Sequence, residues 1–328
     1  MTSLMKAAVY RQYGPADVVT IQNWPKPVPG PNDVLIRMRA CTVSSADWRI
    51  RSCSMPCGFG VAGRLAFGIT APRQPILGSE LAGDVVEIGA AVRNVAVGDA
   101  VVAFSGAKLG AHAEYRCMRA DAVIVRKPPA LSYETATALA FGGTTALDFF
   151  RRGALRAGER ILINGASGAV GSAMVQLAAQ AGAEVTAVCS GANAEAMQQL
   201  GAAHVVDYTR VDFAGAGNRY DVIADTVGNS PYSRVRQVLT SHGRLLLVLA
   251  TLPEMLRAPW VNITSRHRLV AGPAAERVDD LRTLVDMAVD GRFTPLIDSC
   301  FTFDKIAAAH ARVDSGRKRG SVVVTDIC

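Results

Sequence analysis

Hydrophobic residues in the first third of the chain come in short runs that glycine and proline interrupt. Runs at residues 34–40, 82–88 and 100–104 are typical of β-strands bounded by turns, and the chain up to about residue 123 is predicted to be all-β. From Ser132 onward the apolar positions alternate between helical and strand spacing, which is typical of a doubly wound parallel sheet. The strands of this sheet are expected near residues 161–163, 184–189, 204–207, 221–225, 243–249 and 268–271.

The chain returns to β-type sequence after Arg292, with one helix at 304–314 and a terminal strand at 321–325. One helix and one strand are too little for a domain, so this tail is expected to complete the N-terminal one. The pattern therefore predicts an α/β protein with two domains. Residues 1–123 and 292–328 form a β-rich domain, and residues 124–291 form a Rossmann dinucleotide-binding domain.

A glycine-rich turn, Asn-Gly-Ala-Ser-Gly-Ala-Val-Gly at 164–171, lies between the apolar run 160–163 and a helical pattern at 173–181. A strand, a tight turn and a helix are what a dinucleotide pyrophosphate needs. Gly168 would let the backbone approach the phosphates, Gly171 would let the helix pack on the strand, and the free N–H groups at the helix start favour an anion. The predicted cofactor contacts in this turn are Gly165, Ser167, Gly168, Ala169, Val170 and Gly171.

The residue that would read the ribose is Ser190, which ends the second strand about 20 residues after Gly171. A carboxylate at this place would bond the ribose 2′-hydroxyl of NAD and repel a 2′-phosphate, so its absence favours NADPH over NADH. Ser190, Asn193 and Tyr208 are the candidate phosphate contacts, although Ser190 also fits an ordinary loop residue. Neither Lys nor Arg directly follows Ser190, so a charge-assisted contact is missing locally.

Composition and charge exclude several classes of protein. The 328 residues are 50% hydrophobic and 19% charged, with a net charge of +7 and scattered basic residues, so no nucleic-acid partner is expected. The triplet Arg317-Lys318-Arg319 fits a solvated turn as well as a cofactor-phosphate contact. An uninterrupted apolar stretch of about 18 residues and a signal-peptide core are both missing, so no membrane is expected and cytoplasmic residence is the default.

Seven cysteines, at 41, 53, 57, 117, 189, 300 and 328, form no regular framework. Reduced thiols are therefore expected. Cys53 and Cys57 are the close pair, but nothing nearby supplies two further zinc ligands, which favours a structural role for both thiols.

Short motifs along nearly the whole chain point to a known family. They are Pro25-x-Pro-x-Pro29 with 33–36, the segment 43–51, the segment 78–83 with 86–89 and 97–99, Gly142-Gly-Thr-Thr-Ala146, and the glycine turn. With them the chain resembles the medium-chain dehydrogenase/reductase superfamily, specifically its zinc-free quinone oxidoreductase branch, the zeta-crystallin-like proteins. Asp47-Trp48 and the tail 296–324 are most similar to the chloroplast-envelope type. The resemblance implies a GroES-like catalytic domain and a reaction in the cleft between the domains.

The metal-binding positions of the zinc-dependent relatives are occupied by other residues. The resemblance places Ser44, Ser79 and Phe141 where those enzymes have their catalytic zinc ligands, and the cysteine-rich lobe of a structural zinc is missing between Gly89 and Gly110. Because a catalytic zinc needs three protein ligands from His, Cys and carboxylate, no metal is expected.

On the acceptor side, the resemblance gives Ser44, Trp48 and Arg49 as the residues nearest the substrate, although Trp48 also fits a core or wall residue. Thr145 matches the threonine of the family that packs beside the nicotinamide. An interpretation as a hydroxyl that caps the start of a helix fits Thr145 equally well. Asp47 and Glu80 match acidic positions that we expect to be structural and paired with arginines, and His112 is expected to be structural.

Without a Lewis acid, reduction of an electron-poor acceptor is easier to catalyse than dehydrogenation of a simple alcohol. The sequence therefore predicts an NADPH-dependent reductase of quinones or α,β-unsaturated carbonyls, that is, of a small electrophilic substrate. The alternatives are an enoyl reductase dedicated to one pathway and an NADP-binding sensor or structural protein. Loops around 53–72 and 251–262 are expected to carry specificity, and a homodimer is expected to form at the sheet edge near 268–271.

Overall fold

The computed structural model describes residues 3–215 and 217–327 and divides into two compact units. The β-rich unit comprises the chain up to Met55, Gly60–Phe141, and the chain from Glu276 onward, whereas the Rossmann unit comprises Pro56–Phe59 and Gly142–Ala275. These limits differ from the predicted boundaries after residues 123 and 291. The reason is pairing and packing: β7 (Val123–Arg126) joins the sheet of the β-rich unit beside β5 (Ala100–Phe104), and α8 (Val278–Val289) packs on β7.

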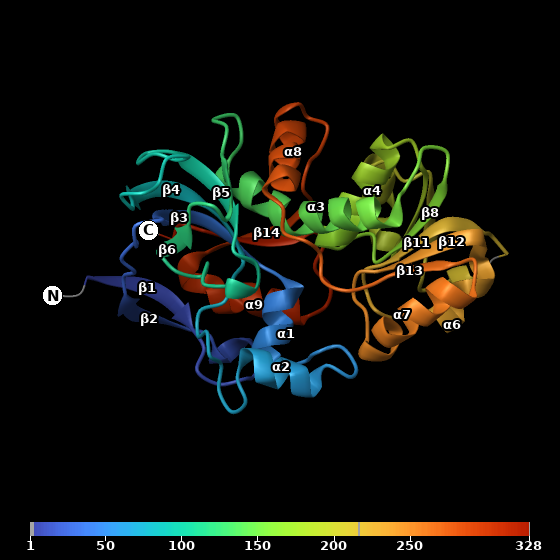
Figure 1. Ribbon diagram of the computed structural model, residues 1–328, viewed down its shortest axis with the longest axis horizontal. Helices are drawn as coiled ribbons and strands as arrows, with labels where there is room; N and C mark the ends of the chain where they lie inside the picture. Colours follow the sequence, from blue (N-terminus) through green and yellow to red (C-terminus); the bar gives the residue numbers. More distant parts are fainter. Residues whose placement is uncertain (1–2, 216, 328) are drawn as a thin grey trace. The chain divides into compact units, whose positions relative to one another are not determined.

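The Rossmann unit contains a six-stranded parallel sheet in the order β10-β9-β8-β11-β12-β13. Figure 1 labels four of its strands, β8, β11, β12 and β13. In chain order the sheet has the arrangement 3-2-1-4-5-6 of dinucleotide-binding folds, so the predicted doubly wound sheet is confirmed. Its strands are β8 (Arg160–Asn164), β9 (Glu184–Cys189), β10 (His204–Asp207), β11 (Tyr220–Asp225), β12 (Leu239–Leu247) and β13 (Arg268–Val270).

Both faces of this sheet are covered, which explains the continuous apolar runs of its central strands. Ile161, Leu162 and Ile163 on β8 are completely buried, although their side chains alternate between the two faces. The helices that include residues of the Rossmann unit are α3 (Tyr133–Gly153), α4 (Ala169–Gln180), α5 (Ala194–Gln199), α6 (Tyr232–Val235) and α7 (Leu252–Thr264).

The segment 251–262 is a helix rather than the predicted loop. Thr251 caps the start of α7 by accepting a hydrogen bond from the Glu254 N–H, and Pro253 lies in the first turn, where its missing N–H costs nothing. The helix was not predicted from the sequence because proline is unfavourable inside a helix and Pro259 lies within this one.

The β-rich unit holds a sheet in the order β14-β15-β3-β4-β5-β7, with β6 paired to β3, and a separate β1-β2 hairpin. The tail completes this unit as predicted, because β15 pairs with β3, and it adds a further strand, β14, beside β15. Helix α9 (Ile306–Asp314) packs against both tail strands. The remaining strands are β1 (Leu4–Val9), β2 (Thr20–Pro25), β3 (Asp33–Val43), β4 (Glu80–Ile88), β6 (Tyr115–Arg119), β14 (Ile297–Thr302) and β15 (Ser321–Thr325).

Two short helices correct the all-β expectation for the first 123 residues: α1 (Ser45–Ser52) and α2 (Gly60–Phe67). Helix α1 starts with a capping box, in which Ser44 and Asp47 satisfy each other's backbone N–H groups. The Ser-x-x-Asp spacing was a readable signal for this helix. Nearby glycines and prolines made the sequence of both helices resemble that of loops. Helix α2 lies within the segment 53–72, which was predicted to be a loop.

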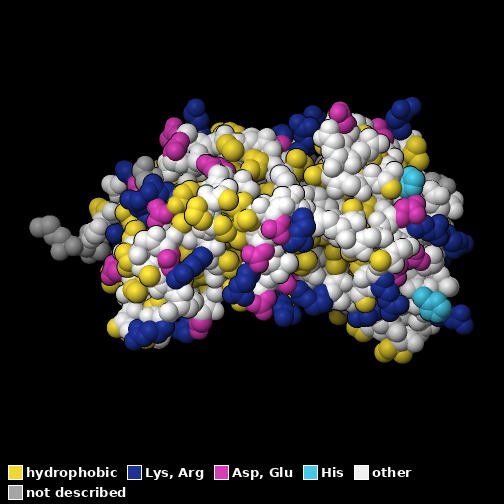
Figure 2. Space-filling view, turned by 90° about the horizontal axis from the view of Figure 1, so that it is seen from above, with side chains coloured by type: hydrophobic (Ala, Val, Ile, Leu, Met, Phe, Trp, Pro, Cys, Tyr) yellow, Lys and Arg dark blue, Asp and Glu magenta, His cyan; other side chains and the backbone are white. Residues whose placement is uncertain are grey.

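The surface carries charges of both signs. On the face shown in Figure 2, Lys and Arg side chains are interspersed with Asp and Glu side chains. Within residues 3–215 and 217–327, the structure contains no helix that is long and apolar enough to cross a membrane. Residence in the cytoplasm stays a prediction.

Candidate cofactor and acceptor sites

The glycine turn follows β8 and leads directly into α4. Gly165 has a φ of +80°, which a residue with a side chain rarely adopts. The N–H groups of Gly165 and Ala166 both donate to the Val188 carbonyl on β9, at 3.1 and 3.0 Å. These two hydrogen bonds hold the turn against the neighbouring strand.

The other two glycines of the turn act differently from each other. A Cβ at Gly171 would lie 2.1 Å from the Gly165 carbonyl oxygen, so only glycine lets α4 approach the turn this closely. At Gly168 the φ is −77°, and a Cβ would meet nothing nearer than the Gly165 oxygen at 3.5 Å. Gly168 is thus not strained, and the space beside it is open to a ligand.

The start of α4 offers unsatisfied donors. Gly168 is the N-cap and supplies no side-chain hydrogen bond to the first turn. The first N–H groups of a helix have no partner within the helix, and the helix dipole adds positive charge there. The Gly168 N–H itself donates to the Gly165 carbonyl at 3.1 Å, so the donors left for an anion at this helix start are the N–H groups of Ala169 and Val170.

Thr145 lies in the middle of α3, so it is not a helix-start hydroxyl. The helix packs closely against the turn, because a Cβ at Gly142 would lie 2.5 Å from the Ala169 carbonyl oxygen. Thr145 is buried and follows Gly142 by three positions, which puts both residues on the same side of α3. This places Thr145 on the side of the helix that faces the glycine turn.

A buried polar cluster that the sequence did not reveal joins the carboxyl ends of β8 and β11. The Asn164 side-chain amide donates to Asp225 Oδ1 at 2.9 Å and to Asn229 Oδ1 at 2.7 Å. Asp225 in turn accepts the N–H groups of Val227, Gly228 and Ser230. The available signal was an aspartate at a strand end followed by Thr-Val-Gly-Asn-Ser. The cluster links the carboxyl ends of these two central strands beside the glycine turn.

The three predicted ribose-phosphate residues meet at the carboxyl ends of β9 and β10. Asn193 Nδ2 donates to Ser190 Oγ at 3.1 Å, so these two side chains form one polar pair. The N–H of Tyr208 donates to the Cys189 carbonyl at 3.2 Å, while its side chain is exposed. The structure therefore brings Ser190, Asn193 and Tyr208 to one corner of the sheet.

An acidic residue that the sequence argument missed occupies the same corner. Asp207 accepts hydrogen bonds from Thr209 N at 3.0 Å and Thr209 Oγ1 at 2.7 Å, and these bonds hold the pKa of its carboxyl below the usual range. A Cβ at Gly191 would lie 2.7 Å from Asp207 Oδ2, so the carboxylate adjoins the residue after Ser190. The positive charge of Arg210 also favours the ionised Asp207. Charges of both signs therefore come from the end of β10 and the turn after it, whereas the sequence had been searched for a charge only directly after Ser190.

In the β-rich unit, Ser44 and Asp47 serve the start of α1. Asp47 Oδ2 accepts from the Ser44 N–H at 2.8 Å and from Ser44 Oγ at 2.7 Å, and Asp47 Oδ1 accepts from the Gly78 N–H at 2.8 Å. The expected arginine partner is wrong for Asp47, since its carboxylate is satisfied by these donors. The Ser44 hydroxyl is likewise committed to the helix cap.

Trp48 and Arg49 lie next to each other on α1 and are both half-buried. Trp48 packs against the core of the β-rich unit, which supports its interpretation as a wall residue. The Arg49 guanidinium lies 5.0 Å from the centre of the Trp48 ring, and its Nη1 donates to the Ser54 carbonyl at 3.1 Å. Burial lowers the pKa of Arg49 from its ordinary value.

Glu80 is buried at the start of β4. Thr42 Oγ1 donates to one of its oxygens, and the Phe141 N–H donates to the other at 2.8 Å. Burial raises the pKa of Glu80 to about 7, against these hydrogen bonds and the charge of Lys318. The cation that acts on Glu80 is therefore a lysine, which corrects the expected pairing with an arginine. Lys318 Nζ donates to the Gly320 carbonyl at 2.6 Å, and burial lowers its pKa.

His112 is structural, as expected. Its ring is completely buried, Nε2 lies 2.9 Å from the Thr42 carbonyl oxygen, and the ring meets His310 edge-on at 5.2 Å between centroids. Burial holds the pKa of His310 well below its ordinary value, so that ring is neutral at physiological pH.

The three positions expected to lack zinc ligands hold two serines and a phenylalanine, Ser44, Ser79 and Phe141. The Ser44 hydroxyl donates to Asp47, and Phe141 offers only its backbone N–H, to Glu80. Across the described ranges, no three His, Cys, Asp or Glu side chains are grouped so that they could hold a metal ion. The six described cysteines are free thiols, and Cys328 lies outside the described residues.

Comparison with known proteins agrees with this geometry. Residues 30–129 match the family described as alcohol dehydrogenase GroES-like domain, and residues 200–324 match the family described as zinc-binding dehydrogenase. The chain is 30% identical to the chloroplast envelope quinone oxidoreductase homolog of Arabidopsis thaliana, over 98% of both chains. It is 27% identical to the chloroplastic NADPH-dependent alkenal/one oxidoreductase of Arabidopsis thaliana, over 98% of this chain and 80% of that one.

Among solved structures, the quinone oxidoreductase from Coxiella burnetii superposes with a TM-score of 0.85 at 26% identity, covering 98% of this chain and 99% of that one. The fold and the matched families together define a two-domain dehydrogenase/reductase. The chain belongs to the medium-chain dehydrogenase/reductase superfamily, in its quinone oxidoreductase branch, which confirms the resemblance seen in the motifs.

Proposed function

We propose that the protein is an NAD(P)H-dependent oxidoreductase that reduces quinones or α,β-unsaturated carbonyls without a metal. The observation that carries the proposal is the glycine turn, because its conformation suits a bound pyrophosphate. Gly171 permits the close approach of α4, and Gly168 leaves open space at the helix start. The names of the quinone and alkenal/one oxidoreductases among the relatives support the class of acceptor.

A bound nicotinamide cofactor would supply the hydride. The residues of this chain bind and orient: the N–H groups at the start of α4 hold the pyrophosphate, and Thr145 lies on the side of α3 that faces the turn. The Asn164–Asp225 cluster keeps the adjoining strand ends in place. Positioning of this kind suffices for an acceptor that is already electron-poor.

Of the three candidate acceptor residues, Arg49 has side-chain N–H donors beyond the one that is already hydrogen-bonded. Its Nη1 donates to the Ser54 carbonyl, whereas the Ser44 hydroxyl is already bound to Asp47. We propose that the Arg49 guanidinium stabilises the oxyanion that develops on the acceptor, with Trp48 as the wall beside it. Glu80 is buried and bound to Thr42 and Phe141, so we assign it no part in proton transfer.

We also propose that NADPH is preferred over NADH. Ser190, Asn193 and Tyr208 supply polar groups at the ribose corner, and Arg210 supplies the positive charge that the segment after Ser190 lacks. The carboxylate of Asp207 opposes a phosphate at the same corner. The preference therefore depends on Arg210 more than on the absence of an acid.

The test is oxidation of NADPH and of NADH by the purified chain with a panel of quinones and enones. Turnover of several such acceptors supports the proposal, and turnover of one acceptor points to an enzyme dedicated to one pathway. Tight NADPH binding without turnover of any acceptor would show a non-catalytic nucleotide-binding protein. The variant Arg49→Met separates binding from chemistry, because it should lower kcat for quinones and leave the affinity for NADPH unchanged.

We propose a homodimer as the assembly. Strand β13 ends the sheet of the Rossmann unit, and α7, which packs on it, exposes large apolar side chains at helical spacing. The exposed fractions are 71% for Leu256, 69% for Trp260 and 83% for Ile263. An open sheet edge beside an apolar helix face is typical of a surface that a second copy covers.

A further inference from the structure

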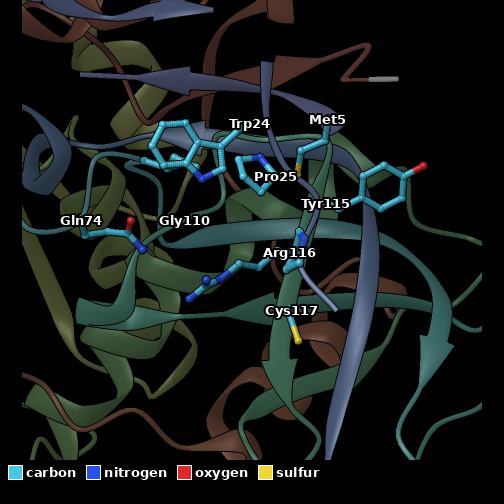
Figure 3. A pocket seen from close by; sticks show the side chains of 10 residues that line it. Met5, Trp24, Pro25, Gln74, Gly110, Tyr115, Arg116 and Cys117 are labelled. Carbon is cyan, nitrogen blue, oxygen red and sulfur yellow. The ribbon is translucent and has the colours of Figure 1, made fainter. Parts of the chain in front are cut away.

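A cavity in the β-rich unit lies apart from every residue assigned to the cofactor or the acceptor. It has a volume of about 130 Å³, and its lining comes from the β1-β2 hairpin, from β6 and from the segments around Gln74 and Gly110 (Figure 3). The wall contributed by the hairpin is apolar, with Met5, Trp24 and Pro25. In Figure 3 the side chain of Arg116 extends along the cavity toward Gln74.

Arg116 is a half-buried cation without an anionic partner in the part of the chain that the structure describes. Among the described residues, its one side-chain hydrogen bond runs from Nη2 to the Lys108 carbonyl at 3.4 Å, which is long for such a bond, and its buried Nε has no partner. Burial lowers the pKa of Arg116 from its ordinary value, as expected for a desolvated charge that lacks a counterion. A desolvated guanidinium gains most from a carboxylate, which can accept two of its N–H groups at once.

The surroundings hold this guanidinium in place. A Cβ at Gly110 would lie 2.9 Å from Arg116 Cζ, so the guanidinium rests against a backbone that only glycine leaves bare. Gln74 Nε2 also donates to the Lys108 carbonyl at 3.4 Å, and a second donor therefore converges on the same spot. Both weak bonds can be exchanged for stronger ones to an anion without moving the backbone.

The cavity is partly open to solvent, so its volume limits the part of a ligand that it encloses. A volume of about 130 Å³ is close to that of a cavity known to hold one benzene ring, and it is far below the volume that a nucleotide or a drug-sized molecule needs. The apolar wall suits a planar or short hydrophobic body, and Trp24 offers an indole for stacking. We propose that this cavity binds a small aromatic monocarboxylate, with its carboxylate on Arg116 and Gln74 and its ring against Trp24.

Benzoate is the probe, titrated into the full chain by calorimetry and followed by saturation-transfer NMR. Saturable binding of benzoate is expected, and uncharged benzamide should bind at least about tenfold more weakly, because it cannot form charge-assisted bonds to Arg116. Arg116→Gln should weaken benzoate by a similar factor. Arg119→Gln is the matched control on the same strand, because Arg119 is exposed and already paired with Asp121; this variant should bind benzoate like the wild type.

Three results would overturn the proposal: no saturable binding up to about 20 mM benzoate, equal affinity for benzoate and benzamide, or unchanged affinity in Arg116→Gln. The comparison of benzoate with benzamide uses the wild-type chain, so it decides the question even if a variant does not fold. Saturating NADPH should leave the affinity for benzoate unchanged, and displacement by NADPH would place benzoate in the nucleotide site instead.

Discussion

Replacing Glu80 by glutamine tests whether its buried carboxyl destabilises the protein at neutral pH. Glutamine matches the protonated acid in shape, can still accept from the Phe141 N–H, and can donate to Thr42 Oγ1. The carboxyl has a pKa of about 7 in the folded protein, compared with 4.5 ordinarily, and the main cause is burial. The variant therefore removes a charge that the folded state disfavours and keeps a hydrogen bond to each partner, with the direction of the bond to Thr42 reversed.

The sign and size follow from linkage between protonation and folding. Because the folded pKa is raised, the stabilisation from the protonated acid is fully present below pH 4.5 and is lost as the pH rises through 7. A difference of 2.5 pKa units (7 − 4.5), at about 1.4 kcal/mol per unit, gives a loss of about 3 kcal/mol. Glu80→Gln should therefore be more stable than the wild type by up to about 3 kcal/mol near pH 8, and equally stable near pH 4.

The assay is denaturant unfolding of both proteins at a series of pH values, with the free energy of unfolding taken from the midpoint and the slope. Glu87→Gln is the matched control on the same strand, β4, because Glu87 is exposed. Its difference from the wild type should not change across this pH range. If Glu80→Gln is less stable than the wild type near pH 8, then Thr42, Phe141 and Lys318 stabilise the carboxylate more than burial destabilises it, and the reasoning is refuted.

Four further predictions concern the cofactor, the metal and the assembly. Gly168→Val should fold, as judged by circular dichroism, and should lose NADPH binding; tight NADPH binding by this variant would contradict the proposed site. Gly171→Val should not fold, because its Cβ would lie 2.1 Å from the Gly165 carbonyl oxygen. Ser190→Asp and Arg210→Gln should each weaken NADPH at least about tenfold and leave NADH nearly unchanged in fluorescence titrations, and equal effects on both cofactors would show that neither residue reads the phosphate. Dialysis against a chelator should leave activity intact, and a loss restored by zinc would contradict the metal-free assignment. Trp260→Ser should turn a dimer into a monomer by light scattering, and a wild-type monomer at micromolar concentration would refute the proposed assembly.

The sequence was sufficient for the Rossmann sheet and the glycine turn because both depend on local patterns. Strands buried on both faces read as apolar runs, and the turn needs glycine at 165 and 171 for reasons of backbone conformation and close packing. The return of the tail to the N-terminal unit followed from the strand at 321–325, which could not form a domain by itself. Helix α1 was missed although its capping box, Ser44 and Asp47, was present in the sequence.

Contacts between residues far apart in the chain were decided only by the tertiary structure. The expected strand at 204–207 already placed Tyr208 in this region, but only the pairing of β10 with β9 shows that the Asp207 carboxylate adjoins Gly191 and that Arg210 acts on it. The raised pKa of Glu80 depends on its burial between Thr42 and Phe141, which come from separate segments. Hydrophobic periodicity records which face of an element is buried, but not which element covers that face, so the charges around each site became visible only when the strands were paired.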